Sequence, residues 1–257
     1  MKLSKRLQFI MEQIPNGSTF ADIGSDHAML PVAAIHSGIA LRAIAGEVNA
    51  GPRDAAAKQV ASAGLNDMIA VRLGNGLEVI SPGEVDVITI AGMGGGLIAS
   101  ILEQGIDKLV GIKKLILQPN VGEEIVRRWL LSHDWVLTSE HIMEEDRKVY
   151  EILTAVPENK GIDGLLNDDV YKEYVLESGN GLVKITKEIS VRMGPWLLQE
   201  KNLIFTSKWL SEIEKLERIV ASLATSTLSS AESKSEEIVQ EIQQIKEVLS
   251  CSPKDRQ

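Results

Sequence analysis

The sequence predicts an α/β fold, in which a doubly wound, mostly parallel sheet occupies the first part of the chain and a helical coiled coil ends it. Three observations indicate this fold class. Short apolar runs alternate with segments of helical periodicity over roughly the first half of the chain. Two strand-like segments then follow each other closely, as in an antiparallel hairpin. Near the C-terminus, apolar residues recur at alternating steps of four and three, as in a coiled-coil seam.

Composition and length narrow the class of protein. The 257 residues suffice for one substantial α/β domain and a smaller one. The formal net charge of −9 argues against a protein that coats nucleic acid indiscriminately, although it is compatible with a local basic surface. Cys251 is the only cysteine and the four histidines lack ligand spacing, so we expect neither disulfides nor a metal site. No apolar run reaches the roughly 20 residues that span a bilayer, which favours a cytoplasmic protein without a membrane partner.

The first two elements are an amphipathic helix and a buried strand. Apolar residues at helical spacing, without the continuous apolar core of a signal peptide, open the chain: Leu3, Leu7, Ile10 and Ile14. Residues 20–23 then predict a short buried strand that breaks at Gly24. We expect it to lead into a helix whose first turn carries Asp26 and His27.

This turn predicts a cofactor site. A strand that turns into a helix leaves unpaired N–H groups and the positive end of the helix dipole facing a crevice. Of the glycines of the dinucleotide fingerprint only Gly24 is present, because Asp26 stands where the second belongs and none of residues 27–30 is a glycine. Asp26 would also repel a pyrophosphate. The pattern therefore favours a cationic cofactor such as S-adenosylmethionine over a diphosphate.

The second strand supplies the next candidate contact. Residues 30–39 are apolar at helical spacing, and residues 43–48 form a strand that contains Glu47 near its end. Glu47 lies 23 positions after Gly24, close to the spacing of about 20 at which an acid commonly binds ribose hydroxyls in nucleotide-binding βαβ units. We predict ribose binding by Glu47, with a merely solvated glutamate as the alternative.

A third contact is expected after the next βα unit. A helix begins at Gly51-Pro52 and stops at Gly64, and residues 69–73 form a third strand. Asn75 follows between two glycines, where its amide is suited to hydrogen-bond an adenine edge. An ordinary Asn-Gly turn is the alternative interpretation.

The fourth strand, residues 85–90, precedes a glycine-rich segment, residues 91–96, and a helix over residues 97–103. Four glycines in five positions let a backbone or a planar ligand approach closely, and such loops lie at the carboxyl edge of a parallel sheet, where ligands bind. We expect Gly92 and Met93 to line the ligand site. A flexible loop is the alternative.

The fifth strand, residues 114–117, ends in Gln118-Pro119-Asn120, and two amides around a proline suit the reading of a base edge. A helix over residues 123–132 follows. Residues 135–142 and 149–155 then predict an antiparallel hairpin that ends the sheet. The first domain is therefore expected to cover residues 1–157.

The second domain, residues 158–257, is expected to be helical. Residues 159–169 predict a linker, residues 171–177 a short helix and residues 179–181 a turn. Two series of apolar residues repeat at steps of four and three: Trp209, Ile213, Leu216, Val220 and Leu223, and then Ile238, Ile242, Ile245 and Leu249. Residues 225–235 can reverse the chain, which predicts an antiparallel pair of helices.

Four cations are expected along one side of the first long helix, because Lys201, Lys208 and Lys215 are seven residues apart and Arg218 lies three beyond. Such a ridge could track a phosphate backbone. Alternatively, these cations pair with the glutamates that flank the seam. The sequence leaves both interpretations open.

Taken together, five motifs resemble those of the bacterial tRNA methyltransferases that modify N1 of adenine 22. In order and spacing they are residues 22–28, 45–47, 74–77, 90–95 and 117–120. The C-terminal helices are similar too, so the resemblance covers nearly the whole chain. It implies a Rossmann-like class I methyltransferase sheet, S-adenosylmethionine as cofactor and tRNA as partner. A terminal antiparallel hairpin also fits methyltransferase sheets better than ordinary nicotinamide-binding ones.

The resemblance also implies roles for the candidate residues. The cofactor would be bound by Asp22, Gly24, Ser25, Asp26, Glu47, Asn75, Gly92 and Met93. The catalytic candidates are Asp26, His27, Gln118 and Asn120. The tRNA would meet Met93 and Pro119, and Lys201, Lys208, Lys215 and Arg218 in the helical domain.

The implied reaction is an in-line displacement in which the lone pair on adenine N1 attacks the sulfonium methyl. Neutral adenine already exposes this lone pair, so alignment and desolvation should supply most of the rate. Asp26 is the candidate for stabilising the developing cation or accepting a proton, with His27 second. The alternative, purely structural roles are a helix N-cap for Asp26 and a hydrogen-bonded structural histidine for His27.

Three other functions remain open from the sequence. They are a small-molecule methyltransferase whose coiled coil serves dimerisation, a nicotinamide-dependent oxidoreductase, and a non-catalytic RNA-binding module on the same fold. Asp26 disfavours the oxidoreductase, because a glycine belongs at this position. The sequence leaves the oligomeric state open, and a monomer is favoured.

Overall fold

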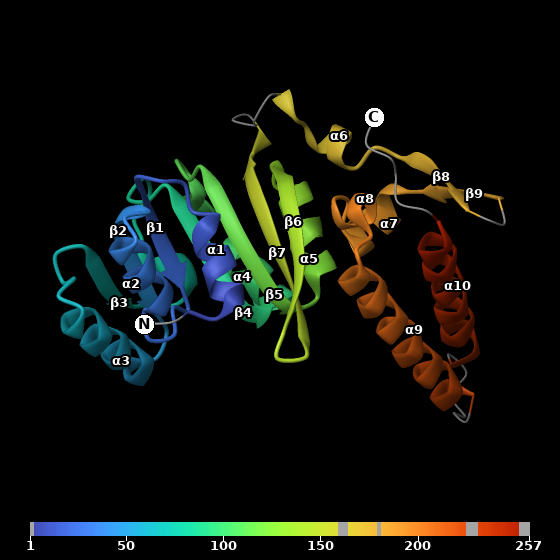
Figure 1. Cartoon of the computed structure of the whole chain (residues 1–257), viewed down its shortest axis with the longest axis horizontal. Helices are drawn as coiled ribbons and strands as arrows, with labels where there is room; N and C mark the ends of the chain where they lie inside the picture. Colours follow the sequence, from blue (N-terminus) through green and yellow to red (C-terminus); the bar gives the residue numbers. More distant parts are fainter. Residues whose placement is uncertain (1–2, 159–163, 179–180, 225–230, 252–257) are drawn as a thin grey trace. The chain divides into compact units, whose positions relative to one another are not determined.

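A computed structural model describes residues 3–158, 164–178, 181–224 and 231–251, and the chain divides into two compact units, Met1–Val170 and Tyr171–Gln257 (Figure 1). The first unit extends beyond the boundary predicted at residue 157. The reason is a short helix, α6 (Asn167–Val170), which packs against strand β6 and buries Val170.

The first unit is built on a seven-stranded sheet with the order β3-β2-β1-β4-β5-β7-β6. Its strands are β1 (Ser18–Ile23), β2 (Ala40–Glu47), β3 (Ile69–Leu73), β4 (Val87–Gly94), β5 (Lys114–Val121), β6 (Trp135–Glu145) and β7 (Lys148–Pro157). The first five are parallel, and β7 pairs antiparallel with both β5 and β6. The order reverses between β1 and β4, which places the ligand crevice of a doubly wound sheet at their carboxyl ends. The predicted α/β sheet and terminal hairpin are confirmed.

Helices cover this sheet. They are α1 (Lys5–Glu12), α2 (Met29–His36), α3 (Ala50–Ser62), α4 (Gly95–Gln104) and α5 (Glu123–Ser132), with 3₁₀ turns η1 (Gly76–Val79) and η2 (Ile106–Leu109). Ile10 of α1, Leu30 of α2 and Val60 of α3 share one buried cluster with Phe20 of β1. Burial of such apolar surface is the main stabilising term of the unit.

Two strands extend further than the sequence indicated. β4 was expected to end at Ile90 and β5 at Leu117, but they stay paired through Gly94 and Val121. The glycine-rich segment is thus partly strand, and α4 begins at Gly95. The expectation of a loop over residues 91–96 was wrong because glycines tolerate the register shifts that this irregular pairing needs.

The second unit begins with a two-stranded antiparallel sheet of β8 (Tyr174–Ser178) and β9 (Gly181–Ile185). The helix predicted over residues 171–177 was therefore wrong. Leu176 is buried while Val175 and Glu177 are exposed, so the period is that of a strand. Residues 179–180 of the predicted turn lie outside the described residues.

Four helices follow, α7 (Lys187–Met193), α8 (Leu197–Glu200), α9 (Leu203–Leu223) and α10 (Ala231–Ser250). The two long helices pack against each other and run in opposite directions (Figure 1). Residues at the predicted seam are buried: Trp209, Ile213 and Leu216 in α9, and Ile238, Ile242 and Ile245 in α10. Val248 is buried in place of the predicted Leu249. Residues 225–230 of the predicted reversal lie outside the described part. Among the helices that the structure describes, none combines the length and the apolar composition of a membrane span.

Candidate active site

The candidate site lies at the carboxyl ends of β1 and β2, which are joined beyond their regular pairing. The N–H groups of Gly24 and Ser25 both donate to the carbonyl of Gly46, at 2.9 and 3.2 Å. The N–H of Gly74, after β3, donates to the carbonyl of Glu47 at 2.9 Å. The predicted segments around Gly24, Glu47 and Asn75 therefore meet at one edge of the sheet.

Asp22 is the buried acid of this edge. Thr89 Oγ1 donates to its Oδ1 at 2.6 Å, and Ser25 Oγ donates to its Oδ2 at 2.6 Å. Burial raises the pKa of Asp22 to about 6, although both hydrogen bonds and the positive charge of Arg6 act to lower it. A cation placed beside Asp22 would stabilise its ionised form, so the site suits a positively charged ligand.

Glu47 is the second buried acid, only 7 % exposed. Its Oε1 accepts a hydrogen bond from the backbone N–H of Asp26 at 2.6 Å. Burial raises the pKa of Glu47, and the hydrogen bond from Asp26 opposes this shift. Because one carboxylate oxygen holds the turn, the other oxygen can accept hydrogen bonds from a ligand.

The turn after β1 is left-handed at three residues in a row, with φ of 41° at Asp26, 64° at His27 and 53° at Ala28. Helix α2 begins only at Met29, so the expectation that its first turn carries Asp26 and His27 was wrong. Ala28 occupies the N-cap position, which excludes the N-cap role considered for Asp26. Successive left-handed residues are costly outside glycine, and such strain concentrates at functional sites.

The Asp26 and His27 side chains of this turn are exposed, whereas that of Ala28 is buried. The Asp26 carboxylate is 87 % exposed, and its Oδ1 lies 3.6 Å from Nε2 of His27. Asp26 thus donates its backbone N–H to Glu47 in a partly buried hydrogen bond and presents its own carboxylate to solvent. An exposed carboxylate is available to a substrate that enters from the open side.

Met93 packs directly on Gly24. Gly24 has φ +72°, and a Cβ added there would overlap the terminal methyl of Met93. The structure therefore brings together two of the predicted ligand-binding positions, one from β1 and one from β4. A side chain at Gly24 would have to displace Met93 and would be strained by the backbone as well.

Gln118 and Asn120 form a clamp with the peptide groups of Gly92, which we call the amide clamp. Gly92 N–H donates to Gln118 Oε1 at 3.1 Å, and Asn120 Nδ2 donates to the carbonyl of Gly92 at 2.8 Å. Gln118 Nε2 closes the ring by donating to Asn120 Oδ1 at 3.1 Å and also donates to the carbonyl of Pro119. Gln118 is fully buried with its amide occupied, whereas Asn120 is exposed and keeps free hydrogen-bonding capacity.

Asn75 is exposed at the start of η1. Its backbone N–H donates to Glu78 Oε2 at 2.9 Å, which fixes the turn. The peptide of the preceding glycine is bonded to Glu47, so Asn75 stands at the same sheet edge as the buried acids.

The four predicted cations of the second unit do not form one ridge. Lys201 precedes α9, and its Nζ donates to the backbone carbonyls of Val248 and Cys251 at 2.9 and 3.4 Å. Lys215 pairs with Glu212 at 3.2 Å. Lys208 lies 5.6 Å from the ring centroid of Trp209. Arg218 is exposed. Because Lys201 precedes the helix, three of the four predicted cations lie on α9 itself: Lys208, Lys215 and Arg218.

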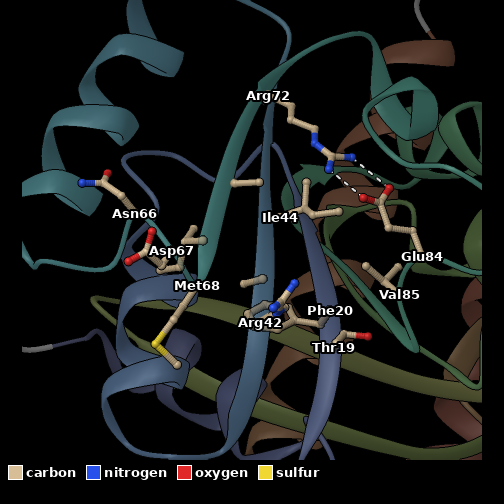
Figure 2. Close-up of a pocket in the computed structure, with 13 residues that line it drawn as sticks. Thr19, Phe20, Arg42, Ile44, Asn66, Asp67, Met68, Arg72, Glu84 and Val85 are labelled. Atoms are coloured by element: carbon tan, nitrogen blue, oxygen red, sulfur yellow. Dashed lines mark hydrogen bonds and ion pairs between the residues drawn. The ribbon is translucent and has the colours of Figure 1, made fainter.

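A cavity of about 200 Å³ lies at the opposite edge of the sheet (Figure 2). It is lined by the beginnings of β1, β2 and β3, among them Thr19, Arg42 and Ile69. Arg72 and Glu84 form an ion pair at 2.6 Å beside it (Figure 2). No residue predicted for the site lines this cavity. Among the described residues there is also no cluster of acids, histidines and cysteines that could hold a metal ion.

Sequence reasoning missed two residues of the site. Thr89 lies in the middle of an apolar strand, and only the pairing of β4 with β1 brings it to Asp22. Arg6 comes from α1, and its guanidinium donates to Gln118 Oε1. The one signal for Thr89 was a polar residue at a buried strand position; Arg6 had no local signal.

The chain is similar to known proteins over nearly its whole length. The family model described as tRNA (adenine(22)-N(1))-methyltransferase matches residues 20–247. A protein of that name from Bacillus subtilis (strain 168) is 43 % identical over 250 residues, which cover 97 % of this chain and 98 % of the relative. The crystal structure of the B. subtilis tRNA methyltransferase TrmK has a TM-score of 0.85 and 43 % identity, covering 96 % and 99 % of the two chains.

Two further solved structures of similar proteins contain S-adenosyl-L-methionine or its product, S-adenosyl-homocysteine. A Streptococcus pneumoniae relative in complex with S-adenosyl-L-methionine has a TM-score of 0.77 and 39 % identity, covering 96 % of this chain and all of the other. TrmK of M. capricolum in complex with S-adenosyl-homocysteine has a TM-score of 0.76 and 26 % identity, covering 97 % and 98 %.

Proposed function

The chain belongs to the tRNA (adenine(22)-N(1))-methyltransferase family, and on that premise we propose that it methylates N1 of adenine 22 in tRNA with S-adenosylmethionine as methyl donor. The observation that carries the proposal is the pair of buried acids at the carboxyl ends of β1 and β2. Asp22 and Glu47 are both buried, and burial raises the pKa of both. Such an edge stabilises a cation and repels a diphosphate.

S-adenosylmethionine, when bound, supplies an electrophilic methyl group on a cationic sulfur. Gly24 lets Met93 pack closely against the strand end, and Glu47 keeps one carboxylate oxygen for ribose hydroxyls. Asn75 offers an exposed amide for the adenine of the cofactor. Asp22, Ser25, Asp26, Gly92 and Met93 complete the proposed binding residues.

The target adenine needs orientation more than it needs a strong base. Its N1 lone pair is free in neutral adenine, so holding the base in line with the methyl group supplies most of the acceleration. Asn120 can hydrogen-bond the base edge with its remaining amide capacity. Gln118 acts through the clamp as a positioning residue, because its own amide is occupied.

Methylation at N1 leaves a positive charge on the base. The exposed carboxylate of Asp26 is the group that we assign to stabilise this charge or to accept a proton from the exocyclic amine, with His27 beside it. Pro119 and Met93 provide the apolar contacts of the base. Because adenine is buried in folded tRNA, it has to be flipped out, as enzymes that act on bases require.

The helical unit is proposed to bind the body of the tRNA. We propose that α9 and α10 form a coiled coil and that Lys208, Lys215 and Arg218 contact phosphates, while Lys201 serves the fold. The exposure of Arg218 supports this assignment. Lys215 should contribute less to tRNA binding, because it already pairs with Glu212. The proposed enzyme is a cytoplasmic monomer.

The test is direct. Unmodified tRNA is incubated with the protein and S-adenosylmethionine, and the nucleosides are analysed by mass spectrometry. We expect 1-methyladenosine at position 22 with wild type and a loss of about tenfold or more in kcat with Asp26→Ala. Absence of transfer by the wild type would leave a non-catalytic RNA-binding module.

A further inference from the structure

Arg6 is a cation that the fold delivers to the candidate active site from the N-terminal helix. The Glu145 carboxylate accepts the N–H of Lys5 at 2.6 Å and the N–H of Arg6 at 3.2 Å, and Ser4 Oγ accepts the N–H of Leu7. These bonds cap the first turn of α1, and a carboxylate is favourable there. The helix is anchored further by Ile10, which is fully buried. Arg6 therefore belongs to a fixed element and not to a loose terminus.

The guanidinium of Arg6 lies against the amide clamp. Its Nη1 donates to Gln118 Oε1, the same oxygen that accepts the N–H of Gly92. Its Cζ lies 5.1 Å from the ring centroid of Tyr150, which restrains the guanidinium further. The side chain is partly exposed. A guanidinium has five N–H donors, so most of them remain for a ligand.

The charges around Arg6 make this position unusual. Apart from His27, the other ionisable groups named for the candidate site are the acids Asp22, Asp26 and Glu47. These acids suit a cationic cofactor, but they repel the phosphates that flank any nucleotide entering the site. A nucleotide substrate therefore needs a compensating cation close to the clamp, and Arg6 is placed there.

We propose that Arg6 binds a backbone phosphate next to the target adenosine and so fixes the flipped nucleotide against Asn120. Guanidinium and phosphate match in geometry and form paired, charge-assisted hydrogen bonds. The bond to Gln118 orients the guanidinium before the tRNA arrives. This inference rests on the proposed function, because it concerns the same nucleotide substrate.

Steady-state methylation of unmodified tRNA over a salt series tests the proposal, with the variants Arg6→Gln and Arg6→Lys. The control is Arg42→Gln, which removes an exposed arginine at the opposite edge of the same sheet (Figure 2). For Arg6→Gln we expect KM for tRNA to rise about tenfold or more at low salt. The slope of log(kcat/KM) against log salt should become shallower by about 0.7 to 0.9, the share of one phosphate.

Arg6→Lys should keep the wild-type salt slope, because its charge is retained, while losing part of the affinity through its different geometry. Arg42→Gln should match wild type in both quantities. The affinity for S-adenosylmethionine, measured by calorimetry without tRNA, should stay within about twofold in all three variants and thereby show that the fold is intact.

Two results would overturn the proposal. If Arg6→Gln lowers kcat but keeps both the tRNA KM and the salt slope, Arg6 acts only through Gln118 on the position of the clamp. If Arg42→Gln flattens the slope as much as Arg6→Gln does, the effect is a general one of net charge. Failure of the wild type to methylate tRNA would instead defeat the proposed function itself, and the two failures are thus distinguished.

Discussion

The acidic side chains at the amino and carboxyl edges of the sheet differ in whether a cationic side chain forms an ion pair with them. Just before β4, Asp86 pairs with Lys113 at 2.7 Å and Glu84 pairs with Arg72 at 2.6 Å. The hydrogen bonds from these cations hold the pKa of both acids at about 2. At the carboxyl edge, Asp22 and Glu47 accept hydrogen bonds but form no ion pair with any described residue, and burial raises their pKa.

This difference separates structural acids from acids that wait for a ligand. The charge of an acid that forms an ion pair is already compensated, so a second cation binds to it only weakly. A buried acid without a cation destabilises the free protein in its ionised form and is relieved when a cation binds. The carboxyl edge is therefore built for a positively charged partner, which the sulfonium and ammonium groups of S-adenosylmethionine supply.

The largest expected difference between the edges is in cofactor binding. Glu47→Gln should weaken S-adenosylmethionine binding by about 10- to 100-fold, because a charge-assisted hydrogen bond to the ligand is lost. Glu84→Gln is the matched control at the amino edge. It should change the affinity less than about twofold and lower stability by no more than about 1 kcal/mol, as for an exposed ion pair. Calorimetric titration of both variants measures this, and equal losses would remove the distinction between the edges.

The pH dependence of stability should have opposite signs at the two edges. The native Asp22 carboxyl keeps its proton up to a pKa of about 6, whereas in the unfolded chain it loses the proton near its ordinary pKa of 3.8. The unfolded state thus binds fewer protons between these pH values, and the free energy of unfolding falls as pH rises through this window, by up to ~3 kcal/mol for this group. Asp86, with its native pKa at about 2, adds stability as pH rises from about 2 to the ordinary aspartate pKa of 3.8.

Urea titrations across these windows, with Asp22→Asn and Asp86→Asn, assign the two slopes. Asp22→Asn should flatten the fall of stability between about pH 4 and 6. Asp86→Asn should flatten the rise at lower pH and leave the upper window unchanged. If wild-type stability rises from pH 4 to 6 and Asp22→Asn removes this rise, the assignment of a raised pKa to Asp22 is contradicted.

A smaller effect is expected at the glycine turn. Gly24→Ala and Gly17→Ala both place a side chain at a left-handed residue, with φ of +72° and +77°, and each should cost about 1 kcal/mol of backbone strain. Only at Gly24 does the new methyl meet Met93, because nothing lies within 4 Å of it at Gly17. Gly24→Ala should therefore also weaken cofactor binding several-fold, and Gly17→Ala should not. Equal affinities of the two variants would mean that the contact with Met93 is irrelevant to the site.

How much of this site could be predicted depends on whether the signal is local. The buried strand, Gly24 and the acid at the end of the second strand are contiguous patterns, and from the sequence all of them were expected at one sheet edge. The left-handed turn at Asp26 was not predicted, because its stability depends on the Glu47 carboxylate from another strand. Arg6 was missed for the same reason, since only the folded sheet brings α1 to Gln118. The strand β8 was missed because its period becomes clear only once β9 pairs with it.

The most direct test of an acid edge completed by a cation is the proton balance of cofactor binding. S-adenosylmethionine is titrated into the protein at pH 6 in two buffers of different ionisation enthalpy, with wild type and Asp22→Asn. We expect the wild type to release a fraction of a proton on binding, because the ligand's positive charge lowers the pKa of Asp22. The release should vanish by pH 8 and be clearly smaller in the variant. Proton uptake, or a release that Asp22→Asn leaves unchanged, would contradict this account.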